Sequence, residues 1–279
     1  MECRPVGHCM ACFTNPSLLA SLWQSQTLRN VTYVTERLTS SLIGGLPPQG
    51  HSIMGLPEYR QAALSAMLDA TRPHSLFPRV PSEAKSVLDV GCHAGHILEA
   101  MQLPADCRVV GCDINREALR LAHRCLPGAS FLAAKAETLP FASASFDVLF
   151  ARSVTYVLDI PKALQEFNRV LKPGGRLWLS LHQWKDCRVI LKDNWKRHRL
   201  KAISLGIYIL ADSALLHHTG RLFRYPLNRS RLISFQTESR FLRTLQTAGF
   251  SDIHFSRDRC FVVEAVKKTF SPVVLSQAA

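Results

Sequence analysis

The feature that most constrains the fold of this chain is a regular alternation of strand-like and helix-like segments between residues 85 and 181. Parallel strands need long crossover connections, which are usually helical, so this alternation predicts a parallel sheet covered on both faces. In chain order we expect a strand at 86–90, a helix at 96–102, a strand at 108–113, a helix at 115–125, strands at 130–134 and 146–151, a helix at 161–170 and, after a tight Pro-Gly-Gly turn at 173–175, a strand at 176–181.

The flanking sequences carry weaker patterns, with apolar residues at helical spacing and Gly- or Pro-rich breaks between them. They predict helices within 16–42 and at 57–70, a loop at 44–50, a helix at 237–248 that ends at Gly249, and a hairpin with strands at 253–255 and 261–266. We therefore divide the chain into a partly helical N-terminal extension (1–83) that is a candidate cover for the active site, a core (84–183), a basic insertion (184–234), a helix and hairpin that complete the core (235–268), and a tail (269–279).

Composition excludes several classes of protein. Of the 279 residues, 47% are hydrophobic and 20% are charged, which is typical of globular proteins and leaves no room for collagen, a coiled coil or wholesale disorder. No apolar run reaches the roughly 18 residues of a membrane span. The net charge of +13 permits acidic partners without selecting one. It is regional, because 84–182 hold 11 basic and 9 acidic residues whereas 185–243 hold 13 basic and 4 acidic residues.

The nine cysteines are odd in number and scattered, and the first residues lack the pattern of a secretory leader. We therefore expect a reducing, cytoplasmic setting with unpaired thiols. Cys9 and Cys12 form a C-x-x-C with Cys3 and His8 nearby, which leaves a metal knuckle as the alternative. The principal prediction is that the protein binds no metal.

One strand-turn-helix segment carries the chemistry. The strand at 86–90 runs into Gly91, and Gly95 precedes the next helix, so backbone can approach a ligand there without a Cβ in the way. Ligands of open parallel sheets bind beyond the carboxyl ends of the strands. Asp113 ends the second strand, where a carboxylate can accept hydrogen bonds from both ribose hydroxyls. We therefore predict a nucleoside-containing cofactor.

The spacing of this turn argues against a dinucleotide. A dinucleotide site usually shows G-x-G-x-x-G facing a pyrophosphate, whereas Gly91 and Gly95 are four residues apart and the acidic Asp89 precedes them. A carboxylate at this position suits a cationic ligand, and S-adenosylmethionine has a sulfonium, an ammonium group and no phosphate.

Five ordered stretches resemble motifs of the class I S-adenosylmethionine-dependent methyltransferases, especially the small-molecule branch that includes quinone methyltransferases: 89–95, 111–115, 136–141, 145–154 and 169–176. The resemblance implies a Rossmann-like, mixed seven-stranded α/β sheet with helices on both faces, an antiparallel C-terminal hairpin, a helical N-terminal extension and a helical lid insertion. It also implies S-adenosylmethionine as the cofactor. The cofactor-binding residues implied in this way are Asp89, Gly91, Cys92, His93, Gly95, Asp113, Ile114, Ala136, Glu137 and Arg152.

Two residues depart from the family pattern. His93 stands where a glycine is usual, beside the methionine part of the cofactor. Lys135 stands where many members have an acid that accepts a hydrogen bond from the adenine amino group. Because a lysine ammonium cannot accept a hydrogen bond, we expect backbone and apolar contacts to hold the adenine instead.

Methyl transfer from a sulfonium requires that the protein position the donor and the acceptor and exclude water from them. It also requires a base where the acceptor group has a high pKa. His182 and Tyr156 are the catalytic candidates, with Asp159, His217 and His218 as alternatives. The basic insertion predicts a lid over a hydrophobic or anionic small molecule, with peripheral contact with an anionic membrane or RNA binding as alternatives. The leading hypothesis is thus a small-molecule methyltransferase. An RNA-modifying methyltransferase and a non-catalytic cofactor-binding protein remain as alternatives.

Overall fold

The computed structural model describes residues 55–68, 77–181, 200–226, 232–257 and 261–269. The chain separates into two compact units, one of residues 1–53 with 188–207 and one of residues 54–187 with 208–279. All contacts described below lie within the second unit. The predicted helix within 16–42, the C-x-x-C motif and the tail lie outside the described residues.

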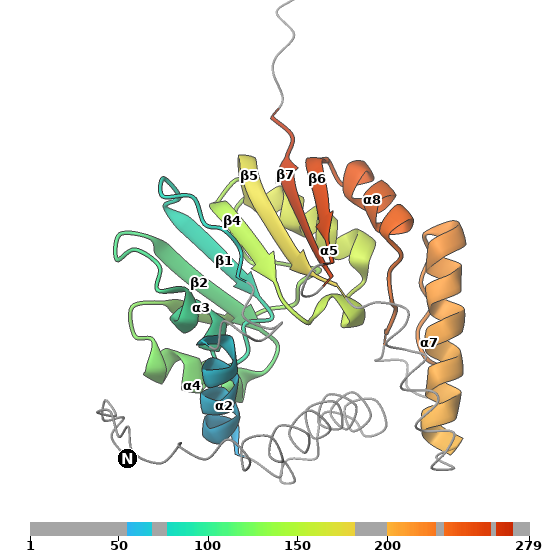
Figure 1. The fold of residues 1–279 in the computed structure, drawn as a ribbon, viewed down its shortest axis with the longest axis horizontal. Helices are drawn as coiled ribbons and strands as arrows, with labels where there is room; N and C mark the ends of the chain where they lie inside the picture. The colour runs from blue at the N-terminus through green and yellow to red at the C-terminus, as the bar shows by residue number, and fades with distance from the viewer. Residues whose placement is uncertain (1–54, 69–76, 182–199, 227–231, 258–260, 270–279) are drawn as a thin grey trace, which may run out of the picture. The chain divides into compact units, whose positions relative to one another are not determined.

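A seven-stranded mixed sheet forms the centre of this unit, in the order β3-β2-β1-β4-β5-β7-β6 (Figure 1). The strands are β1 (Ser86–Val90), β2 (Arg108–Asp113), β3 (Ser130–Ala133), β4 (Phe146–Ala151), β5 (Leu171–Ser180), β6 (Phe250–Ser256) and β7 (Val262–Lys267). The first five strands are parallel, and β7 pairs antiparallel with both β5 and β6. The predicted sheet and its antiparallel C-terminal hairpin are therefore confirmed.

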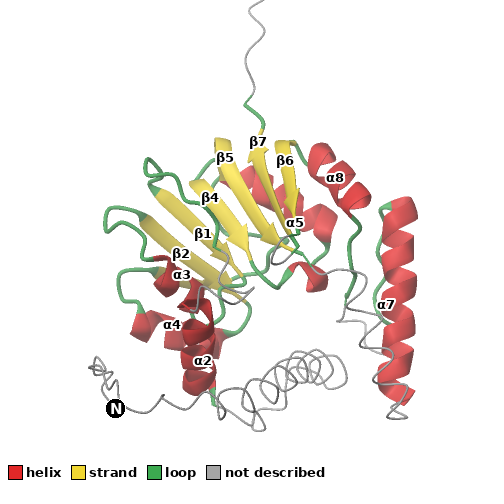
Figure 2. Cartoon of the chain, viewed as in Figure 1, coloured by secondary structure: helices red, strands yellow, loops and turns green. Residues whose placement is uncertain are grey.

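The described helices precede or connect the strands, except that β3 leads to β4 without a helix (Figure 2). They are α2 (Leu56–Leu68), α3 (His96–Met101), α4 (Arg116–Cys125), the 3-10 helix η2 (Thr155–Val157), α5 (Ile160–Val170), α7 (Leu200–Thr219) and α8 (Glu238–Thr247). Helix α4 has a side-chain cap: Asn115 accepts hydrogen bonds from the backbone N–H groups of Glu117 and Ala118, both at 3.1 Å.

Two hydrophobic cores lie on opposite faces of the sheet, because successive side chains of a strand point in opposite directions. Leu88 of β1 belongs to the core that contains Phe167 of α5 and Leu245 of α8. Its neighbour Val87 belongs to the other core, with Ile97 of α3. Helices therefore cover both faces, and β1 is buried along its whole length.

Two predicted strands begin several residues earlier in the structure. The turn predicted at 173–175 lies within β5, because Leu171 already pairs with Phe146 before the ladder resumes at Val148 and Arg176. Gly174, at φ 76°, accommodates this irregularity. The strand predicted at 253–255 is longer, because Phe250 pairs with Lys267. Neither shift moves the carboxyl ends of the parallel strands.

The apolar segment of the basic insertion forms α7, which is the predicted helical insertion. Its second half is joined by hydrogen bonds to the chain that returns to α8. The Tyr208 hydroxyl donates to the Phe223 carbonyl at 2.8 Å, and the Ser213 hydroxyl accepts from the Phe235 N–H at 2.9 Å. Among the described residues, no helix combines the length and the apolarity needed to cross a bilayer.

Candidate cofactor-binding site

The turn after β1 has an unusual backbone. Gly91, His93 and Gly95 all have positive φ, at 81°, 49° and 74°. A Cβ on Gly91 would lie 3.1 Å from Val154, so this glycine satisfies both a backbone conformation and a close approach between the segments that follow β1 and β4. The N–H of Gly91 donates to the Cys112 carbonyl at 2.7 Å, which fixes the turn to the end of β2.

Asp89 lies directly before this turn and is fully buried. Neither of its carboxylate oxygens has a hydrogen-bond partner. Burial raises the pKa of Asp89 well above its usual range, the nearby Asp113 carboxylate raises this pKa further, and Arg152 lowers it. A buried carboxylate whose oxygens accept no hydrogen bond is costly unless a donor reaches it. The ammonium group of S-adenosylmethionine meets that requirement, so the site fits the cofactor implied by the sequence.

Asp113 lies at the carboxyl end of β2, beside the turn. Its Oδ2 atom accepts a hydrogen bond from the N–H of His93 at 2.9 Å, and its Oδ1 atom accepts one from the N–H of Asn115 at 2.8 Å. An ionised carboxylate has about four acceptor positions, so two remain for the hydroxyls of a ribose. The next residue, Ile114, is 65% exposed, which leaves an apolar side chain beside this carboxylate.

Helix α2 of the N-terminal extension lies against the same turn. The buried Arg60 donates from Nε to the Ala94 carbonyl at 3.0 Å and forms an ion pair with Glu99 of α3. The Tyr59 ring meets the His93 ring edge-to-face, with centroids 5.1 Å apart. His93 therefore replaces the usual glycine with an aromatic contact to α2. The sequence predicted this helix, but these long-range contacts have no local signal.

The loop between β3 and β4 contains the residues predicted to flank the adenine. Ala136 is buried, and Glu137 accepts a hydrogen bond at Oε1 from the N–H of Asp159 at 3.0 Å. This bond joins the loop to the residue that precedes α5. Lys135 is exposed and forms an isolated bridge with Thr138.

The predicted catalytic residues follow β4 and β5. Arg152 is buried, and the half-buried Tyr156 accepts a hydrogen bond at its backbone carbonyl from the N–H of Ser234 at 3.0 Å. His182 follows β5 and lies outside the described residues. Of the alternative bases, Asp159 pairs with Lys162 at 2.8 Å and His217 bonds the Thr237 hydroxyl at 2.7 Å.

The predicted cofactor-binding residues therefore lie at, or in the loops after, the carboxyl ends of the parallel strands β1, β2, β3 and β4. Their individual roles toward the cofactor stay predictions. Cys92 is fully buried beside Gly111, where a Cβ would meet its sulfur at 2.8 Å, and burial raises its pKa. Burial also raises the pKa of Cys112 to about 12, which marks it as a packing residue. Among the residues described, no three His, Cys, Asp or Glu side chains form a metal-binding group.

Comparisons with known proteins agree with this geometry. A family described as "Methyltransferase domain" matches residues 88–179. The ubiquinone/menaquinone biosynthesis C-methyltransferase UbiE of Rickettsia typhi is 30% identical over 63% of this chain and 73% of its own length. The demethylmenaquinone methyltransferase of Chlorobaculum parvum is 37% identical over 61% of this chain and 67% of its own length. These matches extend from the cofactor-binding core into the flanking elements.

The chain spans less than two thirds of the length of some other relatives. It spans 66% of a demethylmenaquinone methyltransferase of Chlorobaculum tepidum and 49% of the mitochondrial 2-methoxy-6-polyprenyl-1,4-benzoquinol methylase of zebrafish, at 27% and 41% identity over 61% and 58% of this chain. The CurJ carbon methyltransferase has a similar fold, with a TM-score of 0.56 and 17% identity over 93% of this chain and 73% of that chain. The chain belongs to the class I S-adenosylmethionine-dependent methyltransferases.

Proposed function

We propose that this protein transfers a methyl group from S-adenosylmethionine to a hydrophobic small molecule of the quinone or quinol type. The buried Asp89 carboxylate, which has no partner beside a glycine turn, is the observation that carries the cofactor assignment. Support for the acceptor comes from the relatives, whose names include demethylmenaquinone and polyprenyl-benzoquinol methyltransferases.

In this proposal, two acids and two glycines bind the cofactor. Asp89 neutralises an ammonium group, and Asp113, fixed by two backbone N–H groups, accepts the ribose hydroxyls. Gly91 and Gly95 let the turn approach the ligand closely. When bound, S-adenosylmethionine supplies an activated methyl group on a sulfonium, so the protein contributes mainly position and exclusion of water.

A hydroquinone acceptor needs a base, because loss of a hydroxyl proton makes the neighbouring ring carbon more nucleophilic. We assign this role to His182 or Tyr156, which follow the neighbouring strands β5 and β4. We also propose a reducing, cytoplasmic setting, supported by the buried thiols of Cys92 and Cys112. Peripheral contact with an anionic membrane, where prenylated quinols reside, is supported by the excess of positive charge in residues 185–243.

The first experiment measures cofactor binding by calorimetry with S-adenosylhomocysteine. Asp113→Ala removes a charged acceptor, so we expect binding to weaken about 10- to 100-fold. Asp106→Ala is the matched control, because this carboxylate is exposed and pairs with Lys85 at 2.5 Å. Equal affinity of the Asp113 variant and the wild type would contradict the ribose assignment.

The second experiment identifies the acceptor. We expect S-adenosylhomocysteine to form when the protein and the methyl donor meet a short-chain prenylated hydroquinone in detergent. A malonyl thioester and total RNA serve as competing acceptors. Turnover with RNA alone would replace the proposal with an RNA-modifying enzyme. Cofactor binding without turnover on any acceptor class would favour a non-catalytic protein.

A further inference from the structure

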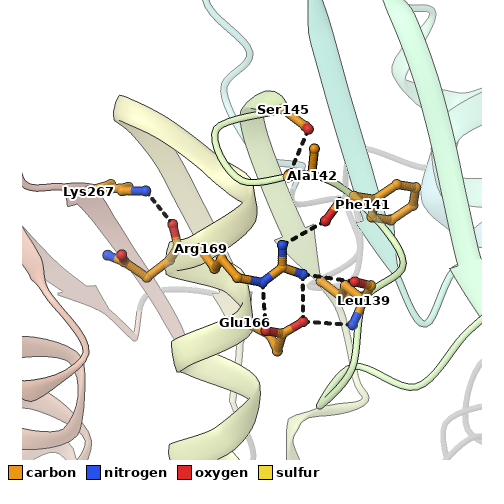
Figure 3. Close-up of polar contacts among 8 residues, drawn as sticks. Leu139, Phe141, Ala142, Ser145, Glu166, Arg169 and Lys267 are labelled. Carbon is orange, nitrogen blue, oxygen red and sulfur yellow. Dashed lines mark hydrogen bonds and ion pairs between the residues drawn. The ribbon is translucent and has the colours of Figure 1, made fainter.

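Two charged residues of α5 form hydrogen bonds with the backbone of the loop that is predicted to flank the adenine. Arg169 donates from Nη2 to the Leu139 carbonyl at 2.8 Å and from Nη1 to the Phe141 carbonyl at 2.6 Å (Figure 3). Glu166 accepts the N–H of Leu139 at 2.8 Å. Three backbone groups within three consecutive loop residues therefore bind one ion pair.

The ion pair is itself rigid. Glu166 and Arg169 are bonded twice, from Nε and from Nη2, each at 2.8 Å (Figure 3). Such a two-point arrangement fixes the plane of the guanidinium, which a lysine ammonium cannot reproduce. The hydrogen bond from Arg169 also lowers the pKa of Glu166, which keeps this carboxylate charged at neutral pH.

The same helix holds the other end of the loop. The Asp159 N–H, at the start of α5, donates to Glu137 Oε1 at 3.0 Å. The loop is therefore attached to both ends of α5, and its buried side chains Ala136 and Leu139 pack into the core between these attachments. Its backbone position is set by α5 and not by the loop sequence alone.

This arrangement matters because the loop lacks a side chain that is common in the family. Lys135 is exposed and cannot accept a hydrogen bond from an adenine amino group. Recognition of the base then depends on backbone groups and apolar contacts of the loop. If that backbone were displaced, no carboxylate at position 135 could still bind the adenine amino group.

We propose that Glu166 and Arg169 are positioning residues that determine the selectivity of this protein for the adenine base, by aligning the backbone of residues 136–141. This inference rests on the proposed S-adenosylmethionine binding. Both side chains bond the loop backbone and each other. Both act through the loop, so they contribute to recognition of the base and not of the methionine end.

Arg169→Lys tests the proposal, because it keeps the charge and loses the planar group. We expect its affinity for S-adenosylhomocysteine to fall about 10-fold, and its preference over S-inosylhomocysteine to fall at least about 3-fold. In the ligand-free protein, the Leu139 N–H should exchange with deuterium faster than in the wild type. The matched control is Arg257→Lys, whose arginine pairs with Glu238 on an exposed surface at 2.7 Å.

A purely structural role for Arg169 would lower the melting temperature and leave the ratio of the two affinities unchanged, and that result would overturn the proposal. If Arg169→Lys does not fold, Glu166→Gln carries the same test, because its amide oxygen can still accept the Leu139 N–H while the ion pair is lost. A wild-type protein that binds neither nucleoside would overturn the proposed function together with this inference.

Discussion

At the scale of single residues, the site combines a glycine that the backbone requires with a buried acid that lacks hydrogen-bond donors. Gly91 adopts its φ of 81° without strain, whereas an L-residue would be strained there. Asp89, two residues earlier, is buried and neither of its carboxylate oxygens has a hydrogen-bond partner, which reduces the stability of the ligand-free fold. Substitutions at these two positions should therefore change stability in opposite directions.

Gly91→Ala should destabilise the fold by about 1–2 kcal/mol, because an L-residue at φ 81° is strained and its Cβ would contact Val154 at 3.1 Å. Urea unfolding measures this change. Gly128→Ala is the control, since its Cβ meets nothing within 4 Å, and it should leave stability unchanged or raise it slightly. Equal stability of the two variants would contradict the requirement for glycine at 91.

Asp89→Asn should have the reverse effect. Because burial raises the pKa of Asp89, the fold loses stability at a pH where this acid is ionised in the unfolded chain, and an asparagine avoids that loss. The melting temperature of the ligand-free variant should therefore exceed that of the wild type at neutral pH. The same change should weaken S-adenosylhomocysteine binding at least about 10-fold, because a charged acceptor for the ammonium group is lost. Thermal denaturation with and without the ligand separates the two effects. A variant that is less stable without ligand would refute this account of Asp89.

At the scale of elements, much of the sheet could be predicted from sequence and much of the site could not. The strands β1, β2 and β4 have the predicted bounds, because each is a short apolar run: Gly91 follows β1, Arg152 follows β4, and β2 ends at Asp113. The contacts of Arg60 with Ala94 and of Arg169 with the adenine loop join residues about 30 positions apart. The spacing of apolar residues along the sequence cannot predict such pairs. The family resemblance therefore predicted the cofactor-binding residues, and the contacts of Arg60 and Arg169 that hold their loops were found only in the structure.

Helix α7 carries a buried acid whose titration can be followed. Asp212 accepts the Phe223 N–H at 2.7 Å through Oδ1, its Oδ2 has no partner, and burial raises its pKa from 3.8 to about 6. Folding therefore favours the protonated acid. The associated stability is complete below about pH 4 and is lost as the pH rises through about 6, a change of about 3 kcal/mol at most.

Asp212→Asn should remove this pH dependence. We expect the variant to be more stable than the wild type at pH 8 and similar to it near pH 4, measured by urea unfolding across that range. The neighbouring Tyr208, whose pKa burial raises to about 12, stays neutral throughout. Glu264→Gln, at an exposed position on β7, is the control and should keep the wild-type profile. A wild-type slope in the Asp212 variant would contradict the assignment.

At the scale of the whole molecule, most of the positive charge lies outside the segment that contains the predicted cofactor-binding residues. The cofactor-binding core is nearly neutral, whereas residues 185–243 carry an excess of nine positive charges. If this excess serves the proposed membrane contact, the protein should bind vesicles containing phosphatidylglycerol and not vesicles of phosphatidylcholine alone. Raising the salt from about 0.05 M to about 0.5 M should release it, because screening shortens the range of these charges. Cosedimentation measures both effects, and binding that ignores salt would contradict the electrostatic account.

The attachment of α2 to the glycine turn has a practical consequence for shortening this protein. The match to the methyltransferase family begins at residue 88, so a shortened protein could be designed to start there. Such a fragment would lack Arg60, so the Ala94 carbonyl and the Glu99 carboxylate would lose their cationic partner beside the predicted cofactor-binding turn. The shortest version worth expressing therefore starts ahead of residue 55.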